Sequence, residues 1–281
     1  MEPIAHLRLV EKSEPPEYDE QTLKAHNENS GKYAAEALRC IELDKVGSFC
    51  GKVHDLGKAT KKFFDYIQPG NTLRRGEVNH TFAAVRYIFE MSDGVDNEVR
   101  ELLAYAVGAH HGQFDAVNDD HKNGFEHRLT KDGIDYDEAK KNFNKYCFSD
   151  AELKSQFNSA AEQITEIIEG IRERNPKRSA RQAEEYEFQI SLLARLLLSA
   201  VIEGDRRDTA EFMENMEFPQ VEADWDECLG HIEEKLGEFS NTRPIDGARK
   251  QISDICRAAA EEEPGIFRLN VPTGAGKTLS G

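Results

Sequence analysis

Apolar residues recur at spacings of three and four positions along most of the chain, from about residue 32 to residue 257. Residues at this spacing share one face of an α-helix, so the pattern predicts an all-α fold. We expect three stripes to face a core: Leu103, Val107 and His110; Phe157, Ala160, Ile164, Ile167 and Ile171; and Leu229, Ile232, Leu236 and Phe239. Proline, glycine and polar residues predict breaks between helices at 69–71, 117–122, 175–177 and 243–244.

The pattern of apolar residues changes from helical to strand-like after residue 263. Residues 266–271 resemble a β-strand, and they lead directly into the stretch VPTGAGKT at 271–278. This stretch nearly fits the phosphate-binding pattern G-x-x-x-x-G-K-[ST], with Val271 in the first glycine position. We therefore divide the chain into a helical domain over 1–240, a linker and helix over 241–264, and the truncated start of a second domain over 265–281.

In phosphate-binding loops of this kind, backbone N–H groups cradle the phosphates of a nucleotide. We expect Lys277 to reach the outer phosphates and Thr278 to bind Mg²⁺, beside Gly274 and Gly276. The stretch resembles motif I of superfamily 2 helicases, in which the first residue is often not glycine, and so implies the start of a RecA-like helicase domain. Because only three residues follow Thr278, we expect no ATP hydrolysis from this chain.

Length, charge and composition limit the class of protein. The 281 residues carry 36 Lys and Arg against 53 Asp and Glu, a net charge of −17, and 38% of them are hydrophobic. This proportion of hydrophobic residues excludes a disordered acidic chain. The negative charge argues against a general nucleic-acid coat, which needs a dense basic surface. Any contact with a polyanion must therefore be local.

Nothing in the sequence predicts export or a membrane span. The N-terminus lacks a basic segment followed by an apolar one. The longest apolar stretch, 191–202, is broken by Arg195 and falls short of the roughly 18 residues that a spanning helix needs. The five cysteines are scattered without a C-x-x-C pair. We expect reduced thiols in a cytoplasmic protein without membrane contacts.

The first candidate for chemistry is the pair His54-Asp55, in the stretch HDLGK at 54–58. Both side chains can reach one metal ion if they lie near a helix end, and Gly57 permits a close approach of the backbone there. Such dipeptides occur by chance in many chains, so the significance of this one depends on further ligands elsewhere.

Further candidate ligands lie in four other segments. Asp205 continues an apolar row of residues at steps of four, which directs its carboxylate to the buried side of a helix, where it needs a partner such as a metal. The histidines in a comparable context are His26, His80, His110 and His111. Thr81 and Asp208 are candidates to orient ligands without touching the metal.

Taken one at a time, these residues have simpler interpretations. A histidine on an apolar face is usually a core residue, and the run 205–208 also fits a solvated helix end with paired charges. The remaining histidines have no comparable context, and we interpret them as surface or structural residues: His6, His121, His127 and His231.

Taken together, the order of the candidate ligands resembles the HD phosphohydrolase superfamily. It resembles more closely the HD nuclease domain of the CRISPR-associated helicase-nuclease of type I systems. The stretches that carry the resemblance are HDLGKATKKFFDYI at 54–67, VNHTFAAV at 78–85, GAHHG at 108–112 and VIEGDRRDT at 201–209. Two positions depart from the family, since Ala83 stands where glycine is frequent and Glu203 where aspartate is common. Neither departure removes a candidate ligand.

The resemblance implies an HD-type helical bundle with two divalent metal ions that share Asp55. The implied ligands of the first ion are His26, His54, Asp55 and Asp205. Those of the second are Asp55, His80, His110 and His111. Ligands of these types suit transition metals such as Mn, Fe, Co, Ni or Zn. Asp55 and Lys58 are the expected catalytic residues. Lys58 would place positive charge near the cleaved phosphate, with a surface lysine as an equal alternative.

The activity that the resemblance implies is hydrolysis of single-stranded DNA in CRISPR antiviral defence. The implied partners are a Cascade-type, CRISPR RNA-guided surveillance complex and a helicase domain in the same chain, which would use ATP and Mg²⁺ only in the full-length protein. Because a chain of net charge −17 repels DNA at long range, we expect substrate to be delivered to the domain. Two alternatives stay open: an HD phosphohydrolase acting on nucleotides, and a non-catalytic, metal-stiffened scaffold that docks a surveillance complex.

Overall fold

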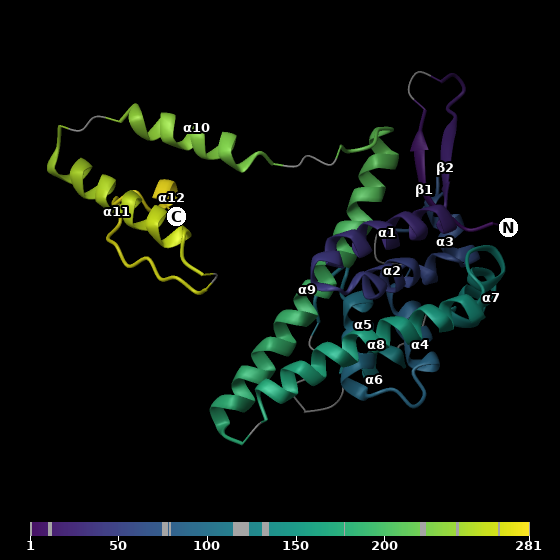
Figure 1. The fold of residues 1–281 in the computed structure, drawn as a ribbon. Helices are drawn as coiled ribbons and strands as arrows, with labels where there is room; N and C mark the ends of the chain where they lie inside the picture. The colour runs from purple at the N-terminus through teal and green to yellow at the C-terminus, as the bar shows by residue number, and fades with distance from the viewer. Residues whose placement is uncertain are drawn as a thin grey trace. The chain divides into compact units, whose positions relative to one another are not determined.

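The computed structural model describes residues 2–10, 13–74, 78, 80–114, 124–130, 135–176, 178–219, 223–239, 242–263 and 265–280. The chain divides into two compact units, Met1–Phe218 and Pro219–Gly281. Its described parts consist mainly of helices, with one two-stranded sheet, which confirms the predicted all-α fold class (Figure 1). Among the described helices, none is both long and apolar enough to cross a membrane.

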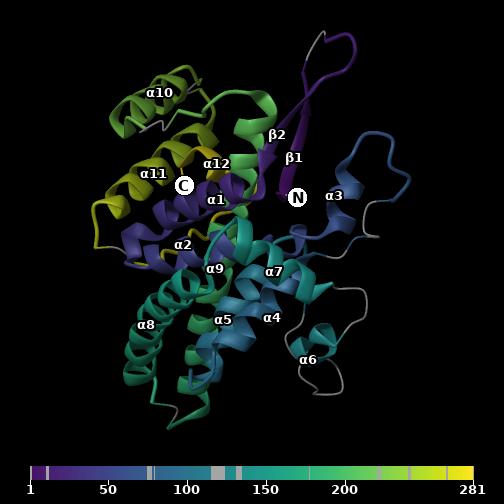
Figure 2. The same ribbon diagram turned by 90° about the vertical axis from the view of Figure 1, so that its right-hand side faces the viewer.

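Unit 1 opens with a β-hairpin and continues as a bundle of helices (Figures 1 and 2). Its elements are β1 (Ile4–Leu9), β2 (Tyr18–Thr22), α1 (Leu23–Leu38), η1 (Arg39–Ile41), α2 (Asp44–Val53), η2 (Leu56–Lys58), α3 (Lys61–Ile67), α4 (Thr81–Met91), α5 (Asn97–Gly108), α6 (Gly124–Leu129), α7 (Tyr136–Tyr146), α8 (Asp150–Arg174) and α9 (Ala180–Glu214). The breaks predicted at 69–71 and 175–177 fall between helices, as expected. The break predicted at 117–122 lies outside the described residues.

The hairpin is an element that helical periodicity does not predict. β1 pairs antiparallel with β2, with Ile4 opposite Thr22. β2 runs straight into α1, and Thr22 is the N-cap of that helix, because its hydroxyl accepts a hydrogen bond from the backbone N–H of Ala25 at 3.2 Å. The hairpin therefore fixes where α1 begins and positions His26 near the start of that helix.

The apolar stripes predicted in unit 1 are buried. The buried members on α5 and α8 are Leu103, Val107, Phe157, Ala160, Ile164 and Ile171, whereas Ile167 is partly buried against them. On α9 the row Leu193, Leu197 and Val201 is buried too. Asp205 follows on the same face of α9, as the spacing of four predicts, so its carboxylate lies at the end of a buried row.

Helices α1, α2 and α9 approach one another closely because small residues lie where they cross. A β-carbon on Gly51 would lie 2.6 Å from the Cα atom of Gly31, and one on Gly204 would lie 2.3 Å from the carbonyl oxygen of Ser30. No larger residue fits at these distances, so the crossings require glycine. Their closeness allows side chains from three different helices to meet at one centre.

Unit 2 contains α10 (Trp225–Gly237), α11 (Pro244–Ala260) and the short helix α12 (Lys277–Ser280). Helix α11 begins at the break predicted at 243–244. The prediction that α10 faces a core is wrong, because α10 has no buried residue and Leu229, Ile232 and Phe239 are exposed. A small unit buries only a modest share of its surface, which leaves such a stripe in water.

The strand predicted over 266–271 is also wrong. Residues 265–272 have no regular secondary structure. The backbone groups of a strand need a neighbouring strand as a hydrogen-bonding partner, and the described part of unit 2 contains none.

Candidate metal centre

The structure brings the seven predicted metal ligands together inside unit 1. His26 lies on α1, His54 and Asp55 where α2 ends and η2 begins, His80 at the N-cap of α4, His110 and His111 after α5, and Asp205 on α9. Most of these residues lie at or just beyond a helix end. There, neighbouring residues can point to the same centre, which they cannot do on the face of one helix.

Asp55 lies at the middle of the cluster. Its Oδ2 atom lies 3.3 Å from Nε2 of His26 and 3.3 Å from Nε2 of His54. Its Oδ1 atom lies 3.6 Å from Nε2 of His110 and 3.8 Å from Nε2 of His80. The two oxygens of one carboxylate therefore face two separate groups of imidazoles.

The first group is completed by Asp205. Its Oδ1 atom lies 3.3 Å from Nε2 of His26 and 3.6 Å from Nε2 of His54. One donor atom from each of His26, His54, Asp55 and Asp205 lies within 4.8 Å of the other three. The side chains of the first three are fully buried, whereas Asp205 keeps 16% of its side chain exposed. Asp205 is thus the member of this group nearest to solvent.

The second group lies on the other side of Asp55. Donor atoms of Asp55, His110 and His111 lie within 4.8 Å of one another. Nε2 of His80 lies 2.8 Å from Nε2 of His111, so these two imidazoles point toward each other. His111 is exposed and His80 is partly buried. The second group is therefore the more accessible one.

Several buried donor atoms of the cluster lack a partner among the described residues. The Nε2 atoms of His26, His54 and His110 and the Oδ1 atom of Asp55 take part in no hydrogen bond, whereas Oδ2 of Asp55 forms an ion pair with Lys58. A buried polar atom without a partner costs free energy of folding, so such atoms are rare. A divalent cation would satisfy these converging lone pairs, and the residues therefore fit a metal.

The other ring nitrogen of each of these histidines is held by a hydrogen bond. Nδ1 of His54 lies 2.7 Å from the carbonyl oxygen of Gly51, and Nδ1 of His110 lies 2.5 Å from that of Val107. A carbonyl oxygen only accepts, so Nδ1 carries the proton and donates it. In the neutral form of each imidazole, Nε2 then carries a lone pair that faces the cluster, which is the arrangement of metal-binding histidines.

The carboxylates around the histidines of the first group stabilise the protonated form of these imidazoles. Burial lowers the pKa of His54, but the charge of Asp55 and the contact with Asp205 outweigh it and raise the pKa to about 10. Burial also lowers the pKa of His26, yet its contacts with Asp205, Asp208 and Asp55 raise it overall. A metal cation that binds to the metal-free protein must therefore displace the protons of His26 and His54.

His80 and His111 behave in the opposite way. Partial removal from water among the other residues of the cluster lowers the pKa of each to about 4. Both imidazoles are therefore neutral at neutral pH, which is the form that binds a metal ion.

Lys58, the second residue predicted to be catalytic, belongs to the cluster and is not a surface residue. It is only 6% exposed, and its Nζ atom forms an ion pair with Oδ2 of Asp55 at 2.6 Å. Burial raises the pKa of Asp55, but the positive charges of Lys58 and His54 outweigh it and hold that pKa well below its usual range. Asp55 is thus an anion that already has one cationic partner.

His6 lies beside the cluster, whereas from the sequence we interpreted it as a surface or structural residue. Its ring centroid lies 4.8 Å from that of His26, and its Nε2 atom lies 3.2 Å from the hydroxyl oxygen of Thr209. Burial and the positive charges of Lys58 and His26 lower its pKa to about 3. Only the hairpin places His6 here, so the helical pattern carried no signal for it. His121 lies outside the described residues.

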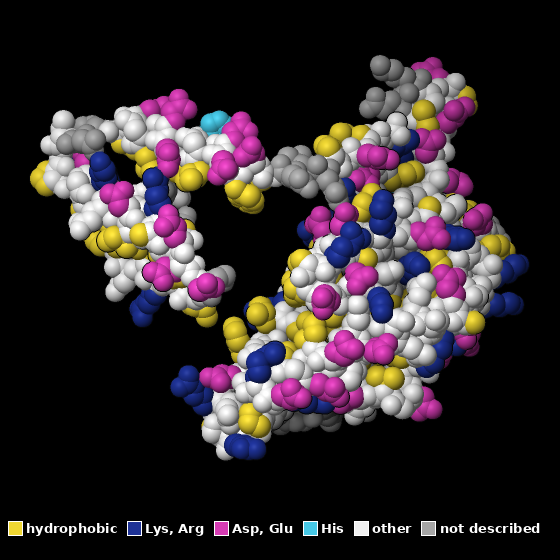
Figure 3. Space-filling model, viewed as in Figure 1, with side chains coloured by type: hydrophobic (Ala, Val, Ile, Leu, Met, Phe, Trp, Pro, Cys, Tyr) yellow, Lys and Arg dark blue, Asp and Glu magenta, His cyan; other side chains and the backbone are white. Residues whose placement is uncertain are grey.

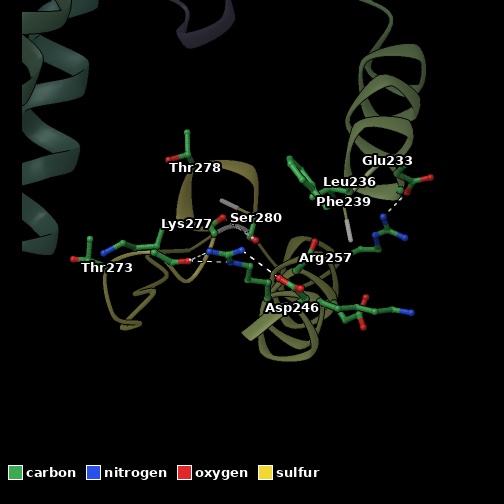
Figure 4. A pocket seen from close by; sticks show the side chains of 16 residues that line it. Glu233, Leu236, Phe239, Asp246, Arg257, Thr273, Lys277, Thr278 and Ser280 are labelled. Carbon is green, nitrogen blue, oxygen red and sulfur yellow. Dashed lines mark hydrogen bonds and ion pairs between the residues drawn. The ribbon is translucent and has the colours of Figure 1, made fainter. Parts of the chain in front are cut away.

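The predicted nucleotide-binding residues lie in unit 2, around a cavity of 790 Å³ (Figure 4). Arg249 of α11 donates hydrogen bonds from Nε and Nη2 to the carbonyl oxygen of Gly274, at 2.9 and 2.7 Å. Nζ of Lys277 donates to the carbonyl oxygen of Val271 at 3.3 Å, so the lysine folds back on its own loop. Four of the residues that line the cavity are Gly274, Gly276, Lys277 and Thr278.

A family model described as Cas3, HD domain, matches residues 20–202, which is more than half of the chain. None of the curated proteins that were compared matches the chain. The matched range contains all the candidate ligands from His26 to His111 and ends just before Asp205. The assignment of Asp205 therefore depends on its position in the structure.

Proposed function

This chain belongs to the Cas3 HD-domain family of CRISPR-associated nuclease domains, and from that premise we propose that it hydrolyses the phosphodiester bonds of single-stranded DNA with two divalent metal ions. The observation that carries the proposal is the convergence of unpartnered Nε2 atoms on both oxygens of Asp55. Neither a solvated face nor an ordinary core gathers buried lone pairs in this way.

We assign the two groups of ligands to two ions. His26, His54, Asp55 and Asp205 would hold one ion, and Asp55, His80, His110 and His111 would hold the other. When bound, such ions activate a water molecule as the nucleophile and neutralise charge on the attacking and leaving oxygens of a phosphodiester. Because most of the donors are imidazole nitrogens, the ions are transition metals such as Mn, Fe, Co, Ni or Zn.

The chain's own residues orient this site and supply charge to it. Asp55 fixes the two groups of ligands relative to each other, because each of its oxygens faces one group. Lys58 carries a positive charge next to Asp55 and, in our proposal, counters negative charge on the phosphate as the bond breaks. The exposed edge formed by His111 and the partly buried His80 is the side from which a phosphate reaches the cluster.

The charge of the chain favours delivery of substrate over its capture. Lys and Arg side chains are scattered among Asp and Glu over the face of unit 1 in Figure 3. With a net charge of −17, the chain repels DNA at long range. We propose that a CRISPR RNA-guided surveillance complex recruits the domain and that a helicase motor in the same protein feeds the strand to it. The phosphate-binding loop of unit 2 supports the presence of such a motor.

The test is digestion of single-stranded DNA by protein loaded with Mn²⁺ or Co²⁺. We expect the Asp55→Ala variant to lose at least about 100-fold in cleavage rate, since both ions share this ligand. The matched control is Asp44→Ala at the opposite end of α2, the helix that leads to His54 and Asp55; its carboxylate accepts a hydrogen bond from Gln163. Equal cleavage by the wild type and the Asp55→Ala variant would refute the proposal.

The same assay separates the two alternatives. Turnover of deoxynucleoside triphosphates or cyclic nucleotides without cleavage of single-stranded DNA would favour a nucleotide phosphohydrolase. Purified protein that binds no transition metal and cleaves none of these substrates would favour a scaffold.

A further inference from the structure

Asp208 is a buried carboxylate one helical turn beyond Asp205 on α9, and it accepts hydrogen bonds from three donors. Its Oδ2 atom accepts from Nδ1 of His26 at 2.6 Å and from Nε2 of Gln21 at 2.8 Å. Its Oδ1 atom accepts from Nδ2 of Asn29 at 2.7 Å. The donors come from β2 and α1, so the carboxylate ties both elements to α9.

The bond to Asp208 distinguishes His26 from the other histidines of the cluster that the structure describes. Nδ1 of His54 and Nδ1 of His110 face backbone carbonyl oxygens, whereas Nδ1 of His26 faces an anion. A hydrogen bond to a charged acceptor is roughly twice as strong as a neutral one. It also makes the imidazole a more basic ligand at its other nitrogen.

We propose that Asp208 is a positioning residue of the first metal group. It keeps a proton on Nδ1 of His26, so that the Nε2 lone pair points at the space between Asp55 and Asp205. Helix α9 thus supplies both a ligand, Asp205, and the residue that orients a ligand from α1. Asp208 itself touches neither metal nor substrate. This inference depends on the proposed metal site and goes beyond it.

The test measures metal binding and is independent of DNA cleavage, so its failure is distinguishable from failure of the proposed nuclease activity. Co²⁺ is titrated into metal-free protein, and the d–d absorption bands report the occupancy of each position. We expect Asp208→Ala to weaken Co²⁺ binding at the first group by about 10- to 100-fold and to leave the second group unchanged. Asp208→Asn keeps an oxygen that can accept from His26, so it should recover part of the affinity.

The matched control is Glu211→Ala, three residues further along α9. Glu211 also joins α9 to α1, because it accepts a hydrogen bond from the hydroxyl of Tyr33, and it has no contact with the candidate ligands among its described partners. A merely structural role for Asp208 predicts that Asp208→Ala and Glu211→Ala weaken Co²⁺ binding equally. That result, or wild-type Co²⁺ affinity in Asp208→Ala, would overturn the inference.

Removal of a buried carboxylate can also unfold the protein, so a milder variant accompanies it. Asn29 is exposed, and Asn29→Ala removes one donor to Asp208 while the bond between Asp208 and His26 remains. We expect a loss of a few-fold in Co²⁺ affinity at the first group alone. If Asp208→Ala does not fold, unchanged Co²⁺ binding in both Asn29→Ala and Asp208→Asn overturns the proposal.

Discussion

Gly57 lies directly against the main chain of His80. A β-carbon at position 57 would come within 2.0 Å of the carbonyl oxygen of His80 and within 2.6 Å of its Cα atom. Gly57 belongs to η2, between Asp55 and Lys58, while His80 is the N-cap of α4. Only a residue without a side chain lets η2 lie close enough to α4 for His80 to face Asp55.

Gly57→Ala should therefore damage the second metal group. The added methyl group must push η2 and the segment at His80 apart, and overpacking of this kind costs about 1–3 kcal/mol. A displacement near 1 Å at a catalytic site lowers the rate on the order of 100-fold. We expect both losses, measured as the free energy of unfolding in urea and as the rate of DNA cleavage.

The control for this prediction is Gly170→Ala, near the C-terminal end of α8. The nearest atoms to a β-carbon there belong to the flexible side chain of Arg174, at 3.5 Å. Because alanine is a better helix former, this variant should gain up to about 1 kcal/mol. A Gly57→Ala variant with the stability and activity of the wild type would contradict the close contact with His80.

Lys58→Met should separate catalysis from metal binding. Methionine keeps an unbranched apolar stem but removes the ammonium group that pairs with Asp55. If Lys58 stabilises charge on the phosphate, cleavage should slow by roughly 10²- to 10³-fold. Binding of Mn²⁺ should be as tight as in the wild type or tighter, because Asp55 then lacks a competing cation.

Lys61→Met is the matched control, since Lys61 is an exposed lysine that pairs with Asp65 on α3. It should leave both the cleavage rate and Mn²⁺ affinity unchanged. A Lys58→Met variant that loses Mn²⁺ and activity together would instead indicate that Lys58 only holds Asp55 in place.

Much of the cluster could be predicted because its ligands lie in locally recognisable patterns. Asp205 extends a buried row on one helix, and His54 stands beside Asp55, so short stretches of sequence carry the signal. The bond between His26 and Asp208 joins residues 182 positions apart, and no local pattern encodes such a contact. His6 was missed for the same reason, since its position depends on the pairing of β1 with β2.

The errors in unit 2 have a different origin. Leu229 and Ile232 follow a helical spacing, and α10 is indeed a helix, but spacing does not say whether a partner covers the stripe. Similarly, residues 266–271 have the composition of a strand, and a strand forms only beside another. Local pattern predicts what a segment can form, whereas burial depends on the rest of the fold.

The pH dependence of metal-free protein follows from two opposite pKa shifts. The pKa of His54 is raised to about 10, above about 6.5 in an unfolded chain, so its contribution to stability is complete below about pH 6.5 and is lost as pH rises toward 10. The pKa values of His80 and His111 are lowered to about 4 in the folded protein. On acidification these two histidines therefore take up protons in the unfolded chain at a higher pH than in the folded one, and the free energy of unfolding falls as pH drops from about 6.5 to 4.

Metal-free protein should therefore be most stable near pH 6.5, with lower free energies of unfolding at about pH 5 and about pH 9. Urea denaturation at these three values in the presence of a chelator measures this. In His54→Gln the alkaline loss should shrink while the acidic loss remains. A stability that rises steadily from pH 6.5 to 9 in the chelated wild type would show that His54 does not hold its proton against Asp55 and Asp205.

Removal of the metal should destabilise the fold as well as abolish cleavage. A ligand that binds only the folded state adds about 2.7 kcal/mol of stability when its free concentration is 100 times its dissociation constant. We therefore expect exhaustive chelation to lower the urea midpoint of the wild type, and Mn²⁺ to restore it together with DNA cleavage. Asp55→Ala should show almost no difference between chelated and Mn²⁺-loaded samples, because it lacks the carboxylate that both groups share. If chelation lowered the stability of Asp55→Ala as much as that of the wild type, Mn²⁺ would be binding elsewhere on the chain. Full cleavage after chelation would mean that the cluster around Asp55 acts without a metal.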